Sequence, residues 1–169
     1  MIEYVDIYNE FKEKTNKIKI RHELLESGEY TLGVQATIIN SLNQILISKR
    51  SEYKKVCPLM WECNGGQVLA GESGIDAIIR EIKEELGITL DKEKALLFKT
   101  VKKEHQFKDI YLFYQDIDIN NIKFIDNEVI DVKWVSINEY MNMFKNNEIV
   151  PNNDFDLNDY NKCLEIIKG

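Results

Sequence analysis

The chain has 169 residues, of which 44% are hydrophobic and 30% are charged, a composition typical of a globular protein with one core. Its formal net charge of −7 argues against a nucleic-acid polymer or an anionic membrane as the main partner. An anionic small substrate stays compatible with this charge, provided that metal ions and local cations neutralise it at the site.

The N-terminus and the cysteines indicate a cytoplasmic protein. Residues 1–6 lack the cationic lead and the apolar run of a signal peptide, and no apolar run is long enough to span a bilayer. The three cysteines, Cys57, Cys63 and Cys163, form no C-x-x-C pair. Reduced thiols in the cytoplasm are therefore the expected state.

Strand-like segments dominate the chain before residue 51. Alternating or β-rich runs predict strands at 3–8, 17–20, 31–40 and 44–50. Residues 22–27 are expected to form a short helix that ends at Gly28, and residues 41–43 a hairpin turn. The segment 51–60 is expected to be a loop, because it carries a proline and several charges.

Residues 66–88 read as a loop followed by a helix. Ser73 is a good N-cap, and Asp76 completes a pair that resembles a capping box. Gly87 stands where a helix ends in a left-handed residue. Between them, apolar side chains recur at helical spacing and form one buried stripe: Ile75, Ile78, Ile79, Ile82 and Leu86.

The other face of this helix carries three glutamates. Glu81, Glu84 and Glu85 stand at i, i+3 and i+4, so their carboxylates crowd one arc about 100° wide. Like charges at this spacing cost roughly 0.2–0.5 kcal/mol per pair without a compensating cation. Clustered carboxylate oxygens suit a hard divalent ion. By spacing alone, a solvated acidic face partly neutralised by Arg80 and Lys83 is the more frequent alternative.

The remainder of the chain shows three strand patterns followed by two helical patterns. Strand patterns cover 95–102, 107–118 and 129–136, and helical patterns cover 138–145 and 156–168. The last helix is expected to pack through Leu157, Tyr160, Leu164 and Ile167. Strands precede and follow a central helix, and further helices come later in the chain. This order favours a mixed sheet with helices on both of its faces. Without a repeat or a low-complexity linker, residues 1–169 are predicted to form one domain.

The whole stretch 66–88 fits the pattern G-x5-E-x7-R-E-U-x-E-E-x-G-U, with U aliphatic, without gap or mismatch. A chance match in a chain of this length is on the order of one in ten million. This pattern identifies the Nudix hydrolases, and the chain resembles that family. The resemblance implies an α/β fold, the Nudix α/β/α sandwich with a mixed β-sheet between helices. Residues 1–30 would then be an N-terminal extension that packs on the core and could serve a homodimer.

The resemblance also implies the activity. Nudix enzymes are metal-dependent pyrophosphohydrolases, so the expected substrate is a nucleoside diphosphate linked to another moiety, and the expected cofactor is Mg²⁺, with Mn²⁺ as a substitute. Divalent cations offset phosphate charge and activate water, and a carboxylate can take the proton. In the family, the residues that match Glu84 and Glu85 bind metal, and the one that matches Glu81 is a ligand or the base.

Further site residues follow from the same resemblance. The backbone carbonyl of Gly65 often supplies a metal ligand. Glu72 would be a more distant ligand or a partner of Arg80, which orients the glutamates by ion pairing and does not touch substrate. Gly65 and Gly66 let the backbone approach metal and phosphate closely.

Many Nudix enzymes recruit one more acid from a later loop. The candidates here are Asp126, Glu128 and Asp131, of which Glu128 best resembles the family's Glu-Val step. A solvated loop acid is the alternative for each. Arg50 could lie near phosphate or form a structural ion pair.

Aromatic and histidine side chains offer weaker candidates. Tyr111, Phe113 and Tyr114 lie on a predicted strand, where packing is more frequent than stacking on a base. His22 and His105 are isolated in the sequence and read better as surface or core residues.

Two other functions compete with hydrolysis. The N-terminal runs at residues 8–10 and 28–30, together with Trp61, resemble the isopentenyl-diphosphate isomerase branch. That isomerase, however, needs a cysteine where this chain has Gly65 and a metal-binding histidine where it has Gln67. A non-catalytic nucleotide sensor would have lost motif glutamates, and this chain retains them all. Hydrolysis is therefore favoured, with the exact substrate set by loops outside the motif.

Overall fold

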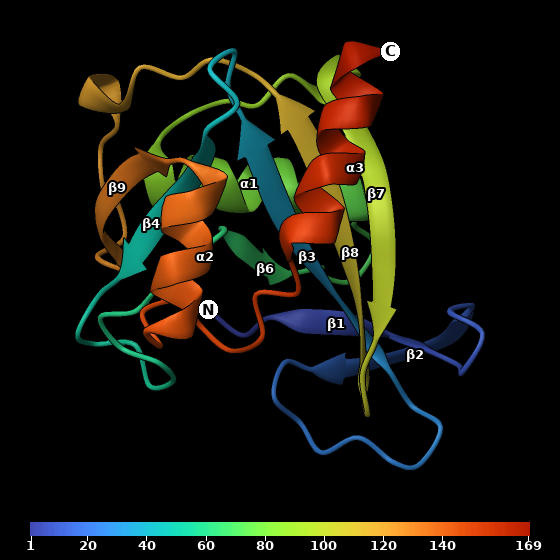
Figure 1. Ribbon diagram of the computed structural model, residues 1–169. Coiled ribbons are helices and arrows are strands. Elements are labelled where there is room, and N and C mark those ends of the chain that lie inside the picture. Colours follow the sequence, from blue (N-terminus) through green and yellow to red (C-terminus); the bar gives the residue numbers. More distant parts are fainter.

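The computed structural model describes residues 1–169, in which a mixed sheet lies between helices (Figure 1). Its strands are β3 (Thr31–Ile39), β4 (Ile45–Arg50), β5 (Trp61–Glu62), β6 (Gly65–Gln67), β7 (Ala95–Lys102), β8 (Gln106–Tyr114) and β9 (Val129–Val135). The strand order is β5-β4-β3-β8-β7, with β6 paired to β3 and β9 paired to β4. β3 and β8 run parallel at the centre, whereas the other pairs are antiparallel.

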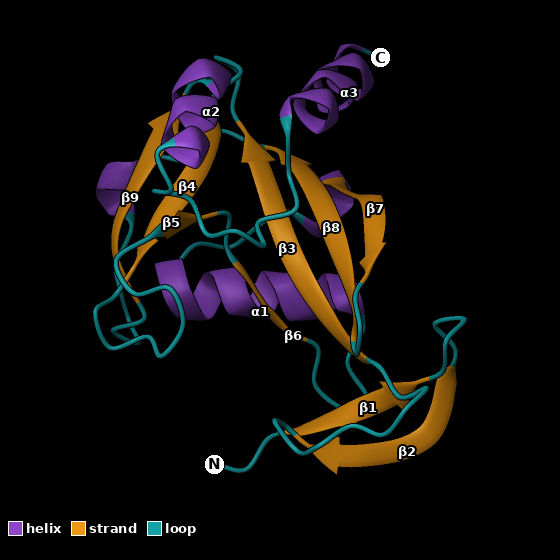
Figure 2. Cartoon of the chain, turned by 60° about the horizontal axis from the view of Figure 1, so that its bottom comes forward, coloured by secondary structure: helices purple, strands orange, loops and turns teal.

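Three α-helices cover the two faces of this sheet. Helix α1 (Gly74–Leu86) lies on one face, and α2 (Ile137–Lys145) and α3 (Leu157–Lys168) lie on the other, as Figure 2 shows. Two short 3₁₀ helices, Lys92–Lys94 and Ile119–Asn121, sit in connections. None of the helices combines the length and the apolar character needed to cross a membrane. The predicted α/β/α sandwich is confirmed.

Apolar side chains on the two faces of the sheet form two cores. Ile78 and Ile82 of α1 pack with Val34 of β3, and all three are buried. On the opposite face, Ile47 of β4 packs with Tyr140 of α2. Because burying one large apolar side chain stabilises a fold by roughly 1.5–3 kcal/mol, packing on both faces fixes the central strands and the loops at their ends.

Helix α1 begins and ends where its sequence predicts. The Ser73 side chain accepts a hydrogen bond from the Asp76 amide (3.2 Å), which caps the N-terminus. Gly87 has a φ of 68° and donates its N–H to the Lys83 carbonyl, which ends the helix in the left-handed conformation. The motif glutamates therefore sit on a helix of defined phase.

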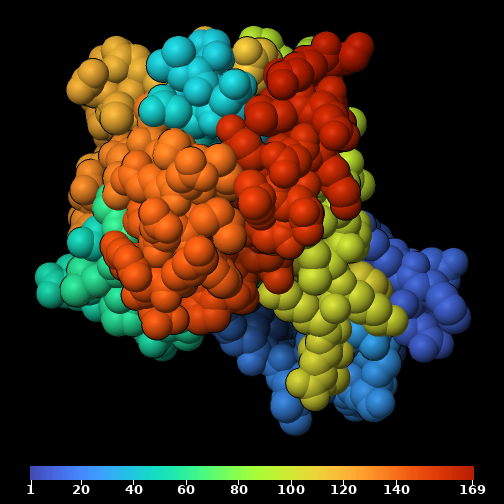
Figure 3. Space-filling view, viewed as in Figure 1, coloured from blue at the N-terminus to red at the C-terminus, as the bar shows by residue number.

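The N-terminal residues form a hairpin of β1 (Tyr4–Tyr8) and β2 (Lys14–Ile20) that packs on the rest of the chain. Tyr8 and Tyr30 exchange backbone hydrogen bonds of 2.8 and 2.9 Å, and the Ala70 N–H bonds to the Tyr4 carbonyl (2.8 Å). In the space-filling view the hairpin stands out as a lobe beside the sheet and helices (Figure 3). The strands predicted at 3–8 and 17–20 are confirmed, and they pair with each other in antiparallel fashion.

The short helix predicted at residues 22–27 is wrong. This segment is a turn followed by irregular structure, and His22 has a φ of 72°, outside the helical region. Six residues are too few to compensate the cost of nucleating a helix. The side chain of Lys19 instead binds the Leu24 carbonyl (3.0 Å), so the segment is held as a loop.

Two later expectations need correction as well. The strand predicted over 107–118 ends at Tyr114, because Tyr114 pairs with Ile39, the last residue of β3. In α3, Tyr160, Leu164 and Ile167 pack on the core as predicted, whereas Leu157 is exposed and Cys163 is buried in its place on the apolar face. The first turn of α3 packs instead through Asp159, which caps the helix and binds the Lys99 ammonium at 2.6 Å.

A buried carboxylate links β2 to the loop that follows it. Glu29 accepts hydrogen bonds from Lys19 (2.6 Å), the Glu26 amide (2.9 Å) and Lys17 (3.2 Å). These bonds, that from Lys19 foremost, lower the pKa of Glu29 from 4.5 to about 2. Because the folded-state pKa is depressed, the stabilisation is present above pH 4.5 and is lost as the pH falls toward 2.

We therefore expect Glu29→Gln to lower the thermal unfolding midpoint by several degrees at pH 7, with a difference from the wild type that shrinks between pH 4.5 and 2. Thermal denaturation followed by circular dichroism over this pH range measures it. Glu26→Gln is the control, because the Glu26 side chain is exposed and forms no ion pair. A difference that stays constant down to pH 2.5 would contradict this assignment.

Candidate functional site

The motif glutamates of α1 meet the glycines of β6 at a small polar cavity of about 120 Å³, here called the acidic cavity. No hydrophobic side chain lines it. Six carboxylates and three cations do: Glu3, Glu81, Glu84, Glu85, Asp126 and Glu128, with Arg21, Lys54 and Arg80. The structure therefore brings together the three predicted motif glutamates and two of the three predicted loop acids.

Arg80 organises one side of this cavity through five hydrogen bonds. Its Nε and Nη2 bind the two carboxylate oxygens of Glu72 at 2.8 and 2.9 Å. Nη2 also reaches the Gln67 carbonyl (3.0 Å), and Nη1 reaches Glu81 (3.0 Å) and Glu84 (3.2 Å). The hydrogen bonds to Glu72, first among several favourable contacts, raise the pKa of Arg80. Arg80 thus links the motif loop, β6 and α1.

The three motif glutamates occupy different environments. Glu85 is only 5% exposed and accepts a hydrogen bond from the Asn64 side-chain amide (2.7 Å). Burial raises the pKa of Glu85 to about 8, and burial also raises the pKa of Glu81, against the opposing charge of Arg80. The Glu84 side chain is 53% exposed and lies at the rim.

The donor atoms of this cavity fit a hard divalent cation. Carboxylate and amide oxygens are the ligands that Mg²⁺ accepts, and a cation would compensate the buried Glu85. The side-chain oxygen of Asn64 is buried without a hydrogen-bond partner, next to Glu85. No three acidic, histidine or cysteine side chains are grouped tightly enough to hold an ion in this arrangement. Arg80, Asn64 and Lys54 bind the carboxylates instead.

The later acidic loop delivers Asp126 and Glu128 to the cavity. Glu128 forms an ion pair with Lys54, and the Glu128 N–H bonds to the Asp126 carboxylate at 3.0 Å. Burial raises the pKa of Asp126. Asp131 lies outside the cavity, exposed on β9 opposite Lys49.

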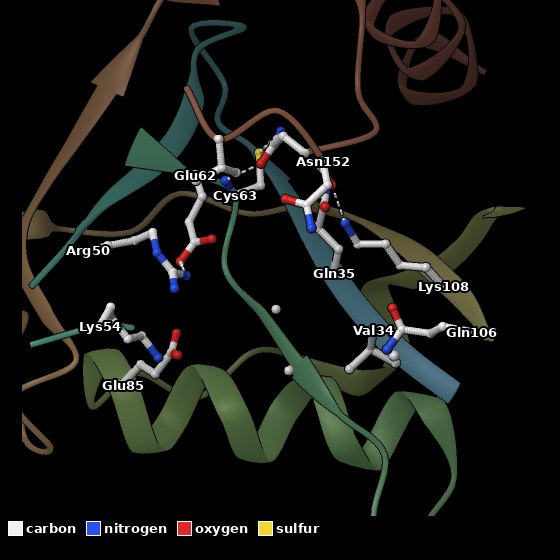
Figure 4. Close-up of a pocket in the computed structure, with 15 residues that line it drawn as sticks. Val34, Gln35, Arg50, Lys54, Glu62, Cys63, Glu85, Gln106, Lys108 and Asn152 are labelled. Atoms are coloured by element: carbon white, nitrogen blue, oxygen red, sulfur yellow. Dashed lines mark hydrogen bonds and ion pairs between the residues drawn. The ribbon is translucent and has the colours of Figure 1, made fainter. Parts of the chain in front are cut away.

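A second cavity of about 140 Å³, here called the sheet cavity, adjoins the acidic cavity. The two share Gly65, Gly66, Lys54 and Glu85 in their linings. Figure 4 shows Lys54 beside Glu85 at one end of the sheet cavity and Gln106 with Lys108 at the other. This continuity would let one ligand reach both cavities.

The polar side chains of the sheet cavity include four amides, three cations and two glutamates. Gln35 is 1% exposed, and its amide nitrogen has no hydrogen-bond partner. Burial lowers the pKa of Lys108, whose ammonium binds the Asn152 carbonyl (2.7 Å) and Asp154 (3.0 Å). No aromatic side chain lines this cavity.

Arg50 forms a structural ion pair. Its Nη1 binds Glu62 at 2.7 Å, and its remaining bonds hold the carbonyls of Val56 and Cys57. These contacts fix the loop that follows β4. The structural alternative for Arg50 therefore agrees with the geometry, although the residue also borders the sheet cavity.

The weaker candidates lie away from the acidic cavity. Phe113 and Tyr111 are both buried in the core that α1 forms with the sheet, and Tyr114 lines a separate depression near Ser41. His105 contacts the Glu29 carbonyl at 3.0 Å, as a satisfied structural histidine does. His22 borders a cavity beneath the N-terminal hairpin.

Sequence reasoning missed Arg21, Glu3, Lys54 and Asn64 at this site. Asn64 could have been found, because it directly precedes the two glycines that were singled out. Arg21 and Glu3 carry no local signal, because they reach the cavity only through the long-range packing of the hairpin. Lys54 lies in a loop with no periodic pattern.

Comparison with known proteins agrees with the family that the motif at residues 66–88 indicates. The NUDIX domain family matches residues 29–153. The chain is 33% identical to an uncharacterized Nudix hydrolase of Listeria innocua, lin0387, over 86% of this chain and 87% of that protein. It is 32% identical, over 78% of its own length and 80% of the relative's, to a Bacillus subtilis protein whose name provisionally describes an 8-oxo-dGTP diphosphatase. The crystal structure of DR0079 from Deinococcus radiodurans shares the fold, with a TM-score of 0.72 over 87% of this chain and 91% of that one, at 23% identity.

Substitution by alanine is expected to have different effects at Gly65 and at Gly66. A Cβ added at Gly66 would overlap the movable carboxyl end of Glu81, whereas a Cβ at Gly65 would overlap the backbone oxygen of Val34. We expect Gly65→Ala to destabilise the fold by about 1–3 kcal/mol, because backbone must shift. Gly66→Ala should keep most of the stability and displace Glu81, which weakens Mn²⁺ binding.

Urea denaturation and a Mn²⁺ titration by electron paramagnetic resonance measure these two effects. Equal stability losses in both variants, or wild-type Mn²⁺ affinity in Gly66→Ala, would contradict this account of the glycines.

Proposed function

The chain belongs to the Nudix hydrolase family of pyrophosphohydrolases, and we propose that it uses a divalent metal ion to cleave the diphosphate linkage of a nucleoside diphosphate joined to another moiety. The convergence of Glu81, Glu84 and Glu85 beside the backbone of Gly65 and Gly66 is the observation that carries this proposal. An all-polar cavity with six carboxylates has little use in a purely structural role, because their mutual repulsion costs stability.

Glu84, Glu85 and the carbonyl of Gly65 would hold Mg²⁺, or Mn²⁺ in its place. When bound, the ion would offset phosphate charge and lower the pKa of the attacking water. Glu81 would complete the ligand set or accept the proton of that water. Its burial supports either role, since an acceptor with a raised pKa holds a proton better near neutral pH.

Arg80 would act as a positioning residue. Its hydrogen bonds orient Glu81 and Glu84, and its bidentate pair with Glu72 anchors it to the motif loop. Glu72 is therefore proposed as the partner of Arg80 rather than as a metal ligand, since both of its oxygens are already engaged. Glu128 is proposed as the additional acid, because it lines the same cavity.

The adjoining sheet cavity supports a polar second moiety on the substrate. Its buried amide at Gln35 and the cation at Lys108 can bind hydroxyl, carbonyl or phosphate oxygens. We further propose that residues 1–169 act as one domain, with the N-terminal hairpin as part of the site.

The activity is tested with a panel of nucleoside diphosphate derivatives and nucleoside triphosphates, each with Mg²⁺, with Mn²⁺ or with EDTA. We expect a nucleoside monophosphate to be released from one substrate class, with EDTA abolishing release, because the carboxylates alone cannot neutralise the phosphates. Release that EDTA does not affect would contradict the metal-dependent proposal.

Glu85→Gln is expected to lower kcat by at least about 100-fold while the protein stays folded. The amide has nearly the same shape and can still accept a hydrogen bond from Asn64, but its neutral oxygen binds a divalent cation more weakly than a carboxylate does. Steady-state kinetics and thermal denaturation measure the two effects. Glu93→Gln is the matched control, because Glu93 is exposed in a 3₁₀ helix outside the cavity. Wild-type turnover in Glu85→Gln would show that Glu85 does not hold the metal.

A further inference from the structure

The N-terminal hairpin carries one arginine toward the acidic cavity. Side chains alternate across β1 and β2, so Val5 and Ile7 face the body of the protein and are buried. Arg21 follows β2 directly and donates its N–H to the Glu3 carbonyl (2.9 Å), which continues the ladder by one residue. It shares the inward face with Glu3, and both side chains line the acidic cavity.

The hairpin is fixed to the motif loop itself. The Ala70 N–H bonds to the Tyr4 carbonyl at 2.8 Å, and the Gly71 N–H bonds to the Asp6 carboxylate at 2.9 Å. These two residues immediately precede Glu72, the partner of Arg80. The position of Arg21 is therefore set by the same loop that leads into α1.

Of the three cations at the acidic cavity, Arg21 has the most N–H donors that are not already used in hydrogen bonds. Arg80 uses five hydrogen bonds, and Lys54 is paired with Glu128. Arg21 makes one side-chain contact, from Nη1 to Glu3 at 2.6 Å, and its side chain is 36% exposed. A guanidinium has five N–H donors in a planar fork, so most of them stay available for a second acceptor.

The surroundings of Arg21 suit an anionic ligand that extends beyond the acidic cavity. Arg21 also lines a cavity of about 260 Å³ beneath the hairpin, together with Gln67 and Gln106. Gln106 in turn lines the sheet cavity. Arg21 therefore stands at a junction, where a ligand held by the motif glutamates can reach a cation.

We propose that Arg21 binds a phosphate oxygen of the substrate's diphosphate, so that the N-terminal hairpin completes the substrate site. The proposal rests on the proposed function, since it assumes a diphosphate at the acidic cavity. Phosphate matches the fork of a guanidinium and accepts two parallel hydrogen bonds from it. Before substrate binds, the Glu3 carboxylate engages one N–H group of this guanidinium and so competes with phosphate for it.

The test combines kinetics with the binding of a non-hydrolysable diphosphate, methylenediphosphonate, in the presence of Mg²⁺. Arg21→Gln should raise KM and the dissociation constant of the probe at least about tenfold, or about 1.4 kcal/mol, with a smaller change in kcat. Arg21→Lys should recover part of this loss, because it restores charge without the fork. Glu3→Gln should lower KM, because it releases the guanidinium.

Lys14→Gln is the matched control. It removes another ion pair of the hairpin, with Asp6 at 2.7 Å, on a side chain that does not line any of the three cavities. It should leave KM at the wild-type value. A structural role for the Arg21–Glu3 pair predicts a different result, in which Arg21→Gln and Glu3→Gln lower the unfolding temperature alike and neither raises KM. That result would overturn the proposal, and so would an equal rise of KM in both variants.

The two proposals fail in distinguishable ways. If the wild type hydrolyses a substrate and Arg21→Gln matches its KM, only the role of Arg21 is wrong. If the wild type hydrolyses nothing in the panel, the proposed function is wrong, and the probe still decides on Arg21. Tenfold weaker binding by Arg21→Gln would support the phosphate contact. Equal binding, or no binding by the wild type, would overturn it.

Discussion

The contact of Arg80 with Glu72 is the interaction on which the arrangement of the site depends. Two parallel N–H···O bonds of 2.8 and 2.9 Å join the helix to the loop that precedes it, and such bidentate pairs fix orientation as well as distance. The same guanidinium reaches the backbone of β6 through the Gln67 carbonyl. Loop, strand and helix are thus held as one unit, and the glutamates of α1 cannot turn away from the glycines of β6.

The rest of the fold keeps this unit in place. One core holds α1 against the sheet, and the other holds α2 and α3 against its opposite face. The motif loop is held from outside as well, because the hairpin binds Ala70 and Gly71. The sequence predicted only that the N-terminal extension packs on the core. In the structure this extension also borders the acidic cavity, where hydrolysis is proposed to occur.

Local patterns predicted the parts of the molecule that local physics determines. The caps at Ser73 and Gly87, the strand alternation and the hairpin turn were correct because each depends on neighbours in the sequence. The helix predicted at residues 22–27 does not form, because the Lys19 side chain of β2 binds the Leu24 carbonyl and holds this segment as a loop. Asp131 failed as a cavity residue because β9 begins at Val129, so only the acids ahead of that strand belong to the loop. Arg21 could not be found without the packing of the hairpin.

Hydrolysis by this protein requires water to attack phosphorus at the acidic cavity. Hydrolysis of a substrate in water enriched in ¹⁸O, followed by mass spectrometry of both products, tests this claim most directly. Attack at phosphorus predicts one ¹⁸O atom in one of the two phosphate-containing products, and no label in the other or in recovered substrate. Products without ¹⁸O, or a rearranged substrate without cleavage, would contradict a hydrolase and point to isomerisation or another transfer.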